Sequence, residues 1–192
     1  MFFVNKHDKN IDSIEQIRSE VLSCTLCNLS LTRIKAVPGE GTPQSKIMFI
    51  GEAPGFVEDN MGIPFVGTAG KILDKYLKIA GINRSEVFIT NIVKCRPPKN
   101  RVPSVEEQKT CFDYLSRQIN IINPKIICLL GRVSFEAILS GSSILQNRGK
   151  IIERNNKKYF VTIHPAAIIY NKKLSDIFEK DLIFLGTLIR NI

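Results

Sequence analysis

The sequence has no hydrophobic run approaching the roughly 18 residues that a membrane-spanning helix requires, which argues against a transmembrane protein. The start of the chain, from Met1 to Lys6, is too short to be the apolar core of a signal peptide. Internal repeats, low-complexity stretches and a convincing interdomain linker are also lacking. Hydrophobic residues make up 44% and charged residues 23%, which is ordinary for a globular protein. We therefore expect a soluble, cytoplasmic chain whose residues 1–192 form one domain.

Acidic residues are too few to balance the basic ones. Lys and Arg number 27 against 18 Asp and Glu, so the formal net charge is +9. An excess of positive charge favours polyanionic partners such as nucleic acids, through electrostatic steering and counterion release. Taken alone, however, the charge fits equally well a basic surface that has no specific partner.

Five cysteines need an explanation other than a disulfide framework, which does not suit a cytoplasmic chain of this size. Cys24 and Cys27 form a C-x-x-C pair, a spacing that lets two thiolates converge on one metal centre. Cys95 lies in a proline-broken loop and Cys111 on an expected helix, whereas Cys128 falls inside the apolar run IICLL and reads as core packing. Four cysteines remain, the number that a zinc ion or an iron–sulfur cluster requires. Unrelated free thiols are the alternative.

Apolar periodicity predicts helices that alternate with strands. Helices are expected over 12–22, 68–80, 104–122, 132–139 and 175–190, and strands over 46–50, 86–90, 125–130 and 159–163. We expect Thr68 to cap the second helix, Gly81 to follow its end, and Ser104 with Glu107 to form a capping box. The alternation indicates an α/β fold, a three-layer α/β/α sandwich around a central, mostly parallel sheet of four strands.

Distinctive polar loops follow three of the four expected strands. The stretch GEAPGFVEDNMGIPFVG, residues 51–67, follows the first strand, residues 91–95 follow the second, and the His-Pro pair at 164–165 follows the fourth. The carboxyl ends of parallel strands meet at one edge of the sheet, where ligand sites lie. We therefore expect these loops to form a single site.

Four motifs in this order, GEAPG, GIPFVG, TNIVKCRPPKNR and IHPAA, resemble those of family 4 uracil-DNA glycosylases, the iron–sulfur type. The resemblance covers roughly residues 20–171. It implies a monofunctional DNA glycosylase that flips uracil out of DNA and hydrolyses its N-glycosidic bond, which initiates base excision repair.

The resemblance also implies a 4Fe–4S cluster on Cys24, Cys27, Cys95 and Cys111, although cysteine ligation alone fits zinc as well. A structural role suits the cluster, because its ligands are far apart in the sequence. It would tie the N-terminal segment, about residues 1–30, to the rest of the domain.

Glu52 and His164 suit the two charges that develop as the glycosidic bond breaks. A carboxylate at Glu52 would stabilise the positive charge on the sugar and orient the attacking water, the role that the resemblance implies for the acid of GEAPG. An imidazole at His164 would donate a hydrogen bond to O2 of the departing uracil anion. Asn100, in PPKNR, is the next candidate for positioning the water. The alternatives are a solvated loop acid at Glu52 and a purely structural hydrogen-bonding role for His164.

Four further residues are expected to recognise uracil. Phe65 offers a ring for stacking, and the amide of Asn91 matches O4 and N3–H of uracil but not the reversed pattern of cytosine. Core packing of Phe65 and an Asx turn at Asn91 are the alternatives. The resemblance implies that a backbone N–H near Ala53 contacts the base. It also places Glu58 near C5 of uracil, where its side chain would exclude the methyl group of thymine.

The last motif departs from the family pattern, which commonly reads His-Pro-Ser-Ala and ends in Arg, because this chain reads HPAAIIYN. A loop that wedges into the gap left by a flipped base would here use Ile168, Ile169 or Tyr170. With the hydroxyl and the arginine missing, Lys172 and Lys173 are the candidates for the phosphate contact.

We expect uracil-containing DNA, single- or double-stranded, to be the partner of a monomer that binds no membrane. Neither end of the chain shows a clear motif for a sliding clamp. One rival function is a broader-specificity glycosylase whose first motif lacks the acid, and Glu52 argues against it. The other is a nucleic-acid-binding domain without activity, and the joint presence of Glu52, Asn91 and His164 argues against that.

Overall fold

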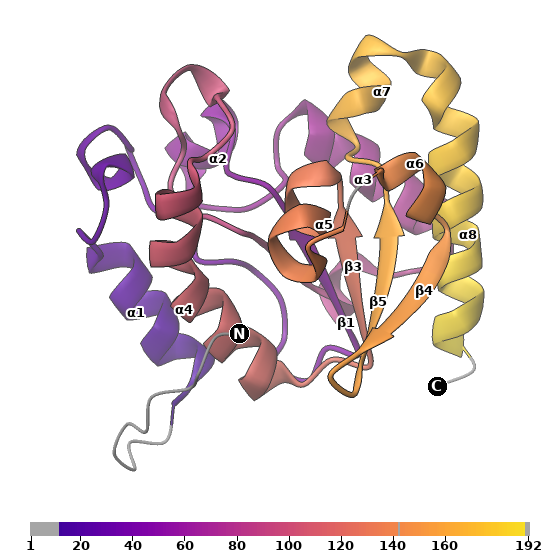
Figure 1. Ribbon diagram of the computed structural model, residues 1–192, viewed down its shortest axis with the longest axis horizontal. Helices are drawn as coiled ribbons and strands as arrows, with labels where there is room; N and C mark the ends of the chain where they lie inside the picture. The colour runs from indigo at the N-terminus through magenta and orange to yellow at the C-terminus, as the bar shows by residue number, and fades with distance from the viewer. Residues whose placement is uncertain (1–11, 142, 191–192) are drawn as a thin grey trace.

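The computed structural model describes residues 12–141 and 143–190, and these form three layers, with helices packed on both faces of one sheet (Figure 1). Within the described residues the sheet has five strands in the order β2-β1-β3-β5-β4. The strands are β1 (Ile47–Gly51), β2 (Phe88–Asn91), β3 (Ile126–Leu130), β4 (Lys150–Arg154) and β5 (Lys157–Thr162). The expected α/β sandwich around a mostly parallel sheet is confirmed, because β2, β1, β3 and β5 all run parallel.

The fifth strand, β4, corrects the expectation of four. It pairs antiparallel with β5 and forms the edge of the sheet. Its sequence, KIIER, has only two apolar residues, and no residue of the strand is fully buried, so its apolar signal is weak. Asn155 and Asn156 join the two strands, and both have a positive φ, 51° and 58°. Two such residues are typical of a tight hairpin turn, and this pair was the overlooked signal.

Most of the longer helices lie where the sequence predicts them. The helices of eight or more residues are α1 (Ile14–Ser23), α3 (Thr68–Ile79), α4 (Val105–Ile122), α5 (Arg132–Leu139) and α8 (Ser175–Arg190). The capping box of Ser104 and Glu107 is present, and Gly81 follows the end of α3 with a φ of 69°. The predicted cap at Thr68 is wrong, because Thr68 is already helical and Gly67 is the N-cap.

Short helical turns occupy the loops between these elements. They are α2 (Phe56–Met61), α6 (Ile144–Asn147), α7 (Ala166–Tyr170) and the 3-10 turns η1 (Asn28–Leu31), η2 (Arg84–Glu86), η3 (Pro98–Asn100) and η4 (Lys172–Leu174). Within the described residues no helix is both long and apolar enough to cross a membrane. The start of the chain, where no signal peptide is expected, lies outside the described residues.

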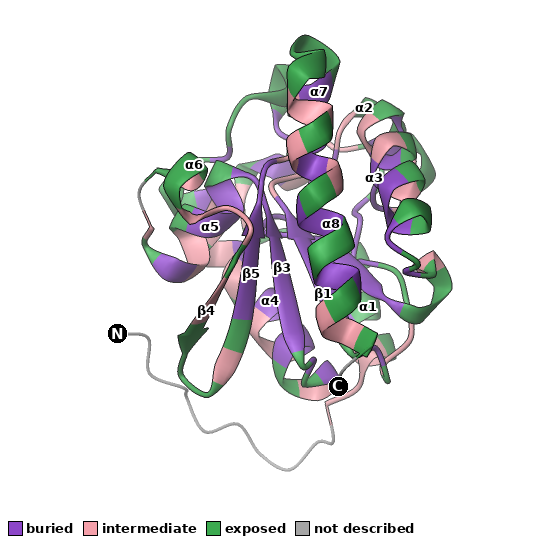
Figure 2. Cartoon of the chain, turned by 90° about the vertical axis from the view of Figure 1, so that its right-hand side faces the viewer, coloured by how far each residue is buried: buried purple, intermediate pink, exposed green. Residues whose placement is uncertain are grey.

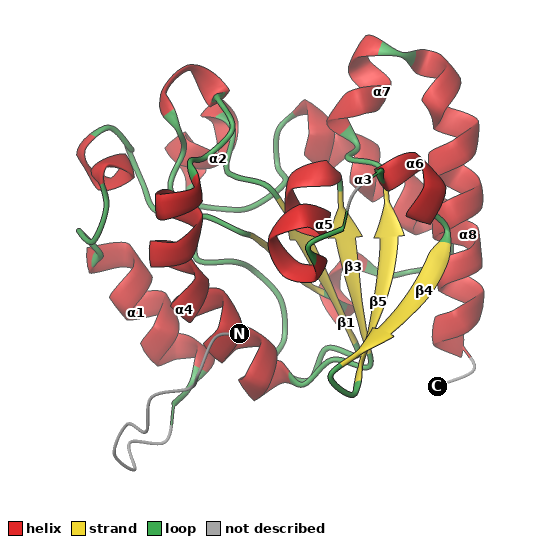
Figure 3. Cartoon of the chain, in the orientation of Figure 1, coloured by secondary structure: helices red, strands yellow, loops and turns green. Residues whose placement is uncertain are grey.

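Two apolar cores lie on opposite faces of the sheet, as the period of two along a strand requires. In β1, Met48 and Ile50 join the core beneath α1, α4 and α5, whereas Ile47 and Phe49 join the core beneath α3 and α8. Figure 2 shows α8 crossing in front of the buried strands, and Figure 3 shows the strands enclosed between helices. Cys128 on β3 is fully buried in the second of these cores, which confirms its assignment to packing.

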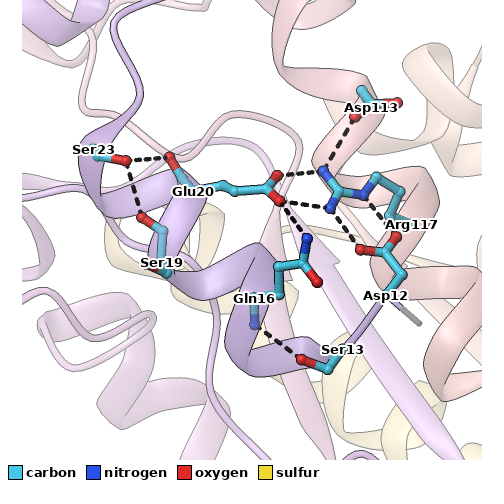
Figure 4. A network of polar contacts seen from close by, with 8 residues as sticks. All are labelled: Asp12, Ser13, Gln16, Ser19, Glu20, Ser23, Asp113 and Arg117. Carbon is cyan, nitrogen blue, oxygen red and sulfur yellow. Dashed lines mark hydrogen bonds and ion pairs between the residues drawn. The ribbon is translucent and has the colours of Figure 1, made fainter. Parts of the chain in front are cut away.

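A polar network holds the N-terminal helix α1 against α4 (Figure 4). The guanidinium of Arg117 on α4 donates to both carboxylate oxygens of Asp12, at 2.6 and 2.7 Å, and to both of Glu20, at 2.5 and 3.0 Å. Asp113, on the preceding turn of α4, lies 3.5 Å from the same group. Hydrogen bonds from Arg117 lower the pKa of Asp12 and of Glu20, so both carboxylates stay ionised.

Candidate functional site

The loops after β1, β2 and β5 meet at the carboxyl ends of the strands, at the end of the molecule where α7 lies (Figure 1). They enclose a cavity of about 290 Å³. All the residues expected to recognise uracil or act on it line this cavity: Glu52, Ala53, Glu58, Phe65, Asn91, Asn100 and His164. The convergence expected from the sequence therefore occurs, and the volume is close to the lower end of the range for small-ligand pockets, about 300 Å³.

Glu52 directly follows β1 and is partly buried at the cavity wall. Its backbone carbonyl accepts a hydrogen bond from the N–H of Val93 at 3.3 Å, which ties it to the loop after β2. Among the described residues none donates a hydrogen bond to its carboxylate. Burial raises the pKa of Glu52, and the positive charge of Arg132 at the start of α5 partly opposes this shift. The result is a carboxylate whose oxygens are free to face a ligand.

His164 lies two residues beyond the end of β5, enclosed by protein yet open to the cavity. Burial lowers its pKa to about 4, although the negative charge of Glu58 opposes the shift, so the imidazole is neutral at physiological pH. Its Nδ1 accepts a hydrogen bond from the N–H of Ala166 at 3.2 Å. The proton of the neutral ring therefore lies on Nε2, and that nitrogen remains available as a donor.

Phe65 forms a buried aromatic wall of the cavity. Its ring centroid lies 5.7 Å from that of His164, and the planes are tilted by 35°. Its φ of 52° is in the left-handed region, which a bulky residue adopts only when its surroundings hold it there. Two glycines make room for it: a Cβ on Gly70 would lie 1.8 Å from the Phe65 carbonyl oxygen, and a Cβ on Gly51 would lie 2.6 Å from the ring. Gly51, from the GEAPG motif, and Gly70, at the start of α3, thus leave the space that the ring and its backbone occupy.

Glu58 organises this loop. One carboxylate oxygen accepts hydrogen bonds from the N–H groups of Val66 and Gly67, at 3.0 and 2.7 Å, and the other accepts one from Gly55 at 3.2 Å. The carboxylate therefore fixes the backbone that follows Phe65 and the start of α2. Its side chain also lines the cavity.

Asn91 ends β2 and is almost completely buried. Its Oδ1 is the one buried side-chain oxygen or nitrogen in the described part of the chain that has no hydrogen-bond partner. Buried polar atoms are normally paired, so an unpaired amide oxygen at a cavity wall indicates a place for a ligand donor. A Cβ on Gly51 would lie 2.5 Å from this oxygen, so the same glycine gives access to both Phe65 and Asn91.

The loop after Cys95 forms a basic rim of the cavity. The Nε of Arg96 donates to Oδ1 of Asn100 at 2.7 Å, and its guanidinium lies 5.1 Å from the ring centroid of Phe56. Arg101 makes two hydrogen bonds to Glu107, at 2.7 and 2.8 Å. The side-chain oxygen of Asn100 is thus already engaged by Arg96.

The segment expected to wedge into DNA lies at the opposite rim, on α7. Ile168 is buried and belongs to the core beneath α3 and α8, so it is not free to leave. Ile169 and Tyr170 are exposed, Tyr170 by 90%, and Tyr170 lines the cavity. Lys172 and Lys173 are exposed in the following turn.

Four cysteines line a second, much smaller cavity between α1, α4 and the loop after β2. They are Cys24, Cys27, Cys95 and Cys111, and all are unpaired thiols. Nη1 of Arg33 donates to Sγ of Cys95 at 3.0 Å, and the N–H of Lys94 donates to Sγ of Cys111 at 3.3 Å. Within the described residues no three Cys, His, Asp or Glu side chains converge tightly enough for a single metal ion.

Three residues near these sites were not predicted from the sequence: Lys94, Arg33 and Arg132. Lys94 is 1% exposed and lies between Asn91 and Cys95 in the chain. Burial lowers its pKa to about 8. A lysine in a polar loop is normally exposed, so only its position between two predicted site residues gave a signal.

Comparison with known proteins agrees with this geometry. A family model described as the uracil DNA glycosylase superfamily matches residues 38–185. The chain is 51% identical to a type-4 uracil-DNA glycosylase of Sulfurisphaera tokodaii, over 89% of this chain and 82% of that protein. It is 46% identical to one of Saccharolobus solfataricus, over 89% and 84% of the two chains, and 42% identical to one of Archaeoglobus fulgidus, over 93% and 94%. The chain therefore belongs to the type-4 family of the uracil-DNA glycosylase superfamily.

Proposed function

We propose that this chain removes uracil from DNA by hydrolysing the bond between N1 of the base and C1′ of deoxyribose. The oxygen of water forms the new bond to C1′, the base leaves with the bonding electrons and gains a proton, and an abasic site remains as the first intermediate of base excision repair. The observation that carries the proposal is the unpaired Oδ1 of Asn91, set in a cavity that also holds a free carboxylate at Glu52. The membership of the type-4 family supports it.

Glu52 acts on the sugar side of this reaction. As the bond breaks, positive charge develops at C1′, and a carboxylate in a partly desolvated cavity stabilises that charge more strongly than water does. The same oxygens accept a proton from the attacking water and orient it. Asn100 lines the same cavity, and because Arg96 holds its amide oxygen, its Nδ2 is the atom that helps to position the water.

His164 acts on the base side. Its neutral ring presents Nε2–H, which donates to O2 of uracil and stabilises the negative charge of the departing base. Burial keeps the ring neutral, so it serves as a hydrogen-bond donor without adding a full positive charge to the site.

Uracil is recognised by stacking on its flat face and by hydrogen bonds to its polar edge. The base lies against the ring of Phe65, while the amide of Asn91 accepts from N3–H through Oδ1 and donates to O4 through Nδ2. Cytosine offers the reverse arrangement and leaves both partners unpaired. The backbone at Ala53 contacts the base. Glu58 holds the loop and crowds the position of a thymine methyl group.

The DNA around the flipped nucleotide is held by both rims. Ile169 and Tyr170 fill the gap in the base stack, and Lys172 and Lys173 bind phosphates in place of the missing arginine. The chain acts as a monomer and as a single domain on single- or double-stranded DNA. A sliding clamp has no evident docking motif in the sequence.

The four cysteines around the second cavity hold a 4Fe–4S cluster. Four thiols and two hydrogen-bond donors to sulfur would suit a cluster bound through thiolates. The cluster supplies a cross-link, because its ligands come from the end of α1, the following loop, the loop after β2, and α4.

Incubation with a uracil-containing oligonucleotide, followed by alkaline cleavage, tests the function. We expect a cut at uracil in single strands and in duplexes, and none at cytosine or thymine in matched oligonucleotides. Binding without a cut would support the inactive binding domain, and cuts at several other damaged bases would support the broader-specificity enzyme.

Metal analysis of the purified protein tests the cluster. We expect iron, a brown colour and broad visible absorption, which Cys111→Ala should abolish. Cys128→Ala is the matched control, because this cysteine lies in the core and should leave the iron in place. Zinc without iron in the wild-type protein would refute the cluster.

A further inference from the structure

Lys94 is a buried cation for which the catalytic account has no role. Its side chain is 1% exposed, and its three ammonium hydrogens meet three oxygen atoms. Nζ donates to Oγ1 of Thr90 at 2.5 Å, to the backbone carbonyl of Asn91 at 2.9 Å and to Oε1 of Gln118 at 2.8 Å. Two of these acceptors belong to the last two residues of β2, where the uracil-reading amide is located.

The acceptors around Lys94 are themselves fixed. Gln118 on α4 donates through Nε2 to the carbonyl oxygen of Pro38 at 2.7 Å, and the hydroxyl of Thr90 lies 3.3 Å from the same oxygen. The network therefore ties β2 to α4 and to the segment before β1. Its groups have little freedom to move independently.

The backbone of Lys94 connects this network to the cysteine site. Its N–H donates to Sγ of Cys111 at 3.3 Å, its carbonyl accepts from the N–H of Val37 at 2.7 Å, and Cys95 is the next residue. One residue thus contacts both the end of the uracil-reading strand and the proposed cluster ligands.

We propose that Lys94 is a positioning residue that fixes the peptide of Asn91, so that the amide meets the edge of uracil in the correct orientation. This inference rests on the proposed function. Lys94 acts through Asn91 and does not touch the base: its ammonium holds the carbonyl of Asn91, while Oδ1 of the same residue stays unpaired and open to the ligand. A simpler role would be to offset the negative charge of a cluster bound by thiolates.

Two measurements on Lys94→Met separate these roles, because methionine keeps an apolar stem and removes the charge. The first is inhibition by free uracil, which reports the pocket alone, and the second is affinity for a uracil-free duplex, which reports the DNA surface. We expect the uracil inhibition constant to rise by at least about fivefold and single-turnover excision to slow by at least about tenfold, with duplex affinity within about twofold of wild type. Lys125→Met, an exposed lysine outside the site, is the control and should change neither value.

Thr90→Val and Gln118→Met test the same network without altering the neighbours of the cysteines. Each removes one acceptor of Nζ and should weaken uracil inhibition in the same direction, with the iron retained. The proposal is overturned if Lys94→Met keeps wild-type uracil inhibition. If Lys94→Met loses iron or fails to fold, the proposal is overturned when Thr90→Val and Gln118→Met bind uracil as the wild type does. An inactive wild-type protein would instead refute the proposed function.

Discussion

The polar groups of the Arg117 network and those of the uracil cavity differ in how fully they are paired. At the contact between α1 and α4, Arg117 donates to all four carboxylate oxygens of Asp12 and Glu20 (Figure 4). In the cavity, Oδ1 of Asn91 has no partner and the carboxylate of Glu52 receives no hydrogen bond from the described residues.

This difference separates groups that hold the fold from groups that wait for a ligand. A folded protein normally pairs its buried polar atoms, because an unpaired one loses hydrogen bonds to water without replacement. Unpaired polar atoms are therefore tolerated at a site where a bound substrate supplies the missing hydrogen bonds. The comparison predicts that changes in the cavity affect the rate, whereas changes in the Arg117 network affect stability.

The largest expected effect is on the rate of the His164→Ala variant. Removing a donor that stabilises charge only near the transition state typically lowers the rate about 100- to 1,000-fold, or about 2.7–4 kcal/mol. Duplex affinity should change little, because the lost contact forms as the bond breaks. Single-turnover kinetics and a binding titration measure the two quantities. A loss of affinity that accounts for the whole loss of activity would show that His164 only helps to bind DNA.

A smaller effect on the rate is expected for Asn91→Asp. A carboxylate cannot donate to O4 of uracil, so excision of uracil should fall by at least about tenfold. It can accept from the N4 amine of cytosine, so weak excision of cytosine is the accompanying expectation. Parallel assays on uracil and cytosine oligonucleotides measure the ratio. An unchanged preference for uracil at the wild-type rate would mean that Asn91 only closes a turn after β2.

Arg117→Met should lower stability and leave catalysis unchanged. The lost charge-assisted hydrogen bonds are in contact with solvent, so we expect a loss of about 1–2 kcal/mol in the free energy of unfolding. In a chain of this size, such a loss of stability lowers the melting temperature by roughly 2–8 °C. Thermal denaturation measures the shift, and Arg132→Met, which removes a more exposed ion pair with Glu136, is the comparison. An excision rate that falls with Arg117→Met at low temperature would remove the distinction between the two regions.

A further effect is expected in the pH dependence of stability. The His164 pKa is about 4 in the folded chain and about 6.5 in the unfolded one, so the unfolded chain binds more protons between these values. Stability should therefore fall as the pH decreases from about 6.5 to about 4. Burial raises the pKa of Glu52, so this residue acts in the opposite sense and makes stability depend less steeply on pH. Denaturant titrations across this range should show a flatter profile for His164→Asn, and an unchanged profile would contradict the assigned neutral state.

The sequence predicts the framework well wherever a pattern is local. The bounds of α5 and α8 match the predicted ranges, because their apolar periodicity and end signals lie within the segment itself. The edge strand β4 was missed because its residues are mostly exposed and the strand depends on pairing with β5. Its local signal, the asparagine pair at 155–156, is a feature of the turn and not of the strand.

The residues of the site could be predicted from the sequence, but the hydrogen bonds between them could not. Motifs at the carboxyl ends of strands predicted that Glu52, Asn91 and His164 would meet, and the cavity brings them together. The burial of Lys94 was not predictable, because its partner Gln118 lies 24 residues away on α4 and only the folded chain brings the two together. Such contacts depend on tertiary packing, which a single sequence does not display.

The most direct test is the single-turnover rate of uracil excision by Glu52→Gln and by Arg117→Met, measured at saturating enzyme and at a temperature where both variants are folded. Glutamine keeps the size of Glu52 and removes the charge proposed to stabilise the sugar cation. We predict a rate lower by roughly 100- to 1,000-fold for Glu52→Gln, with DNA binding unchanged or tighter, and a rate within about twofold of wild type for Arg117→Met. Excision by Glu52→Gln at the wild-type rate would contradict this prediction, and Asn100 would then be the residue to test for positioning the water.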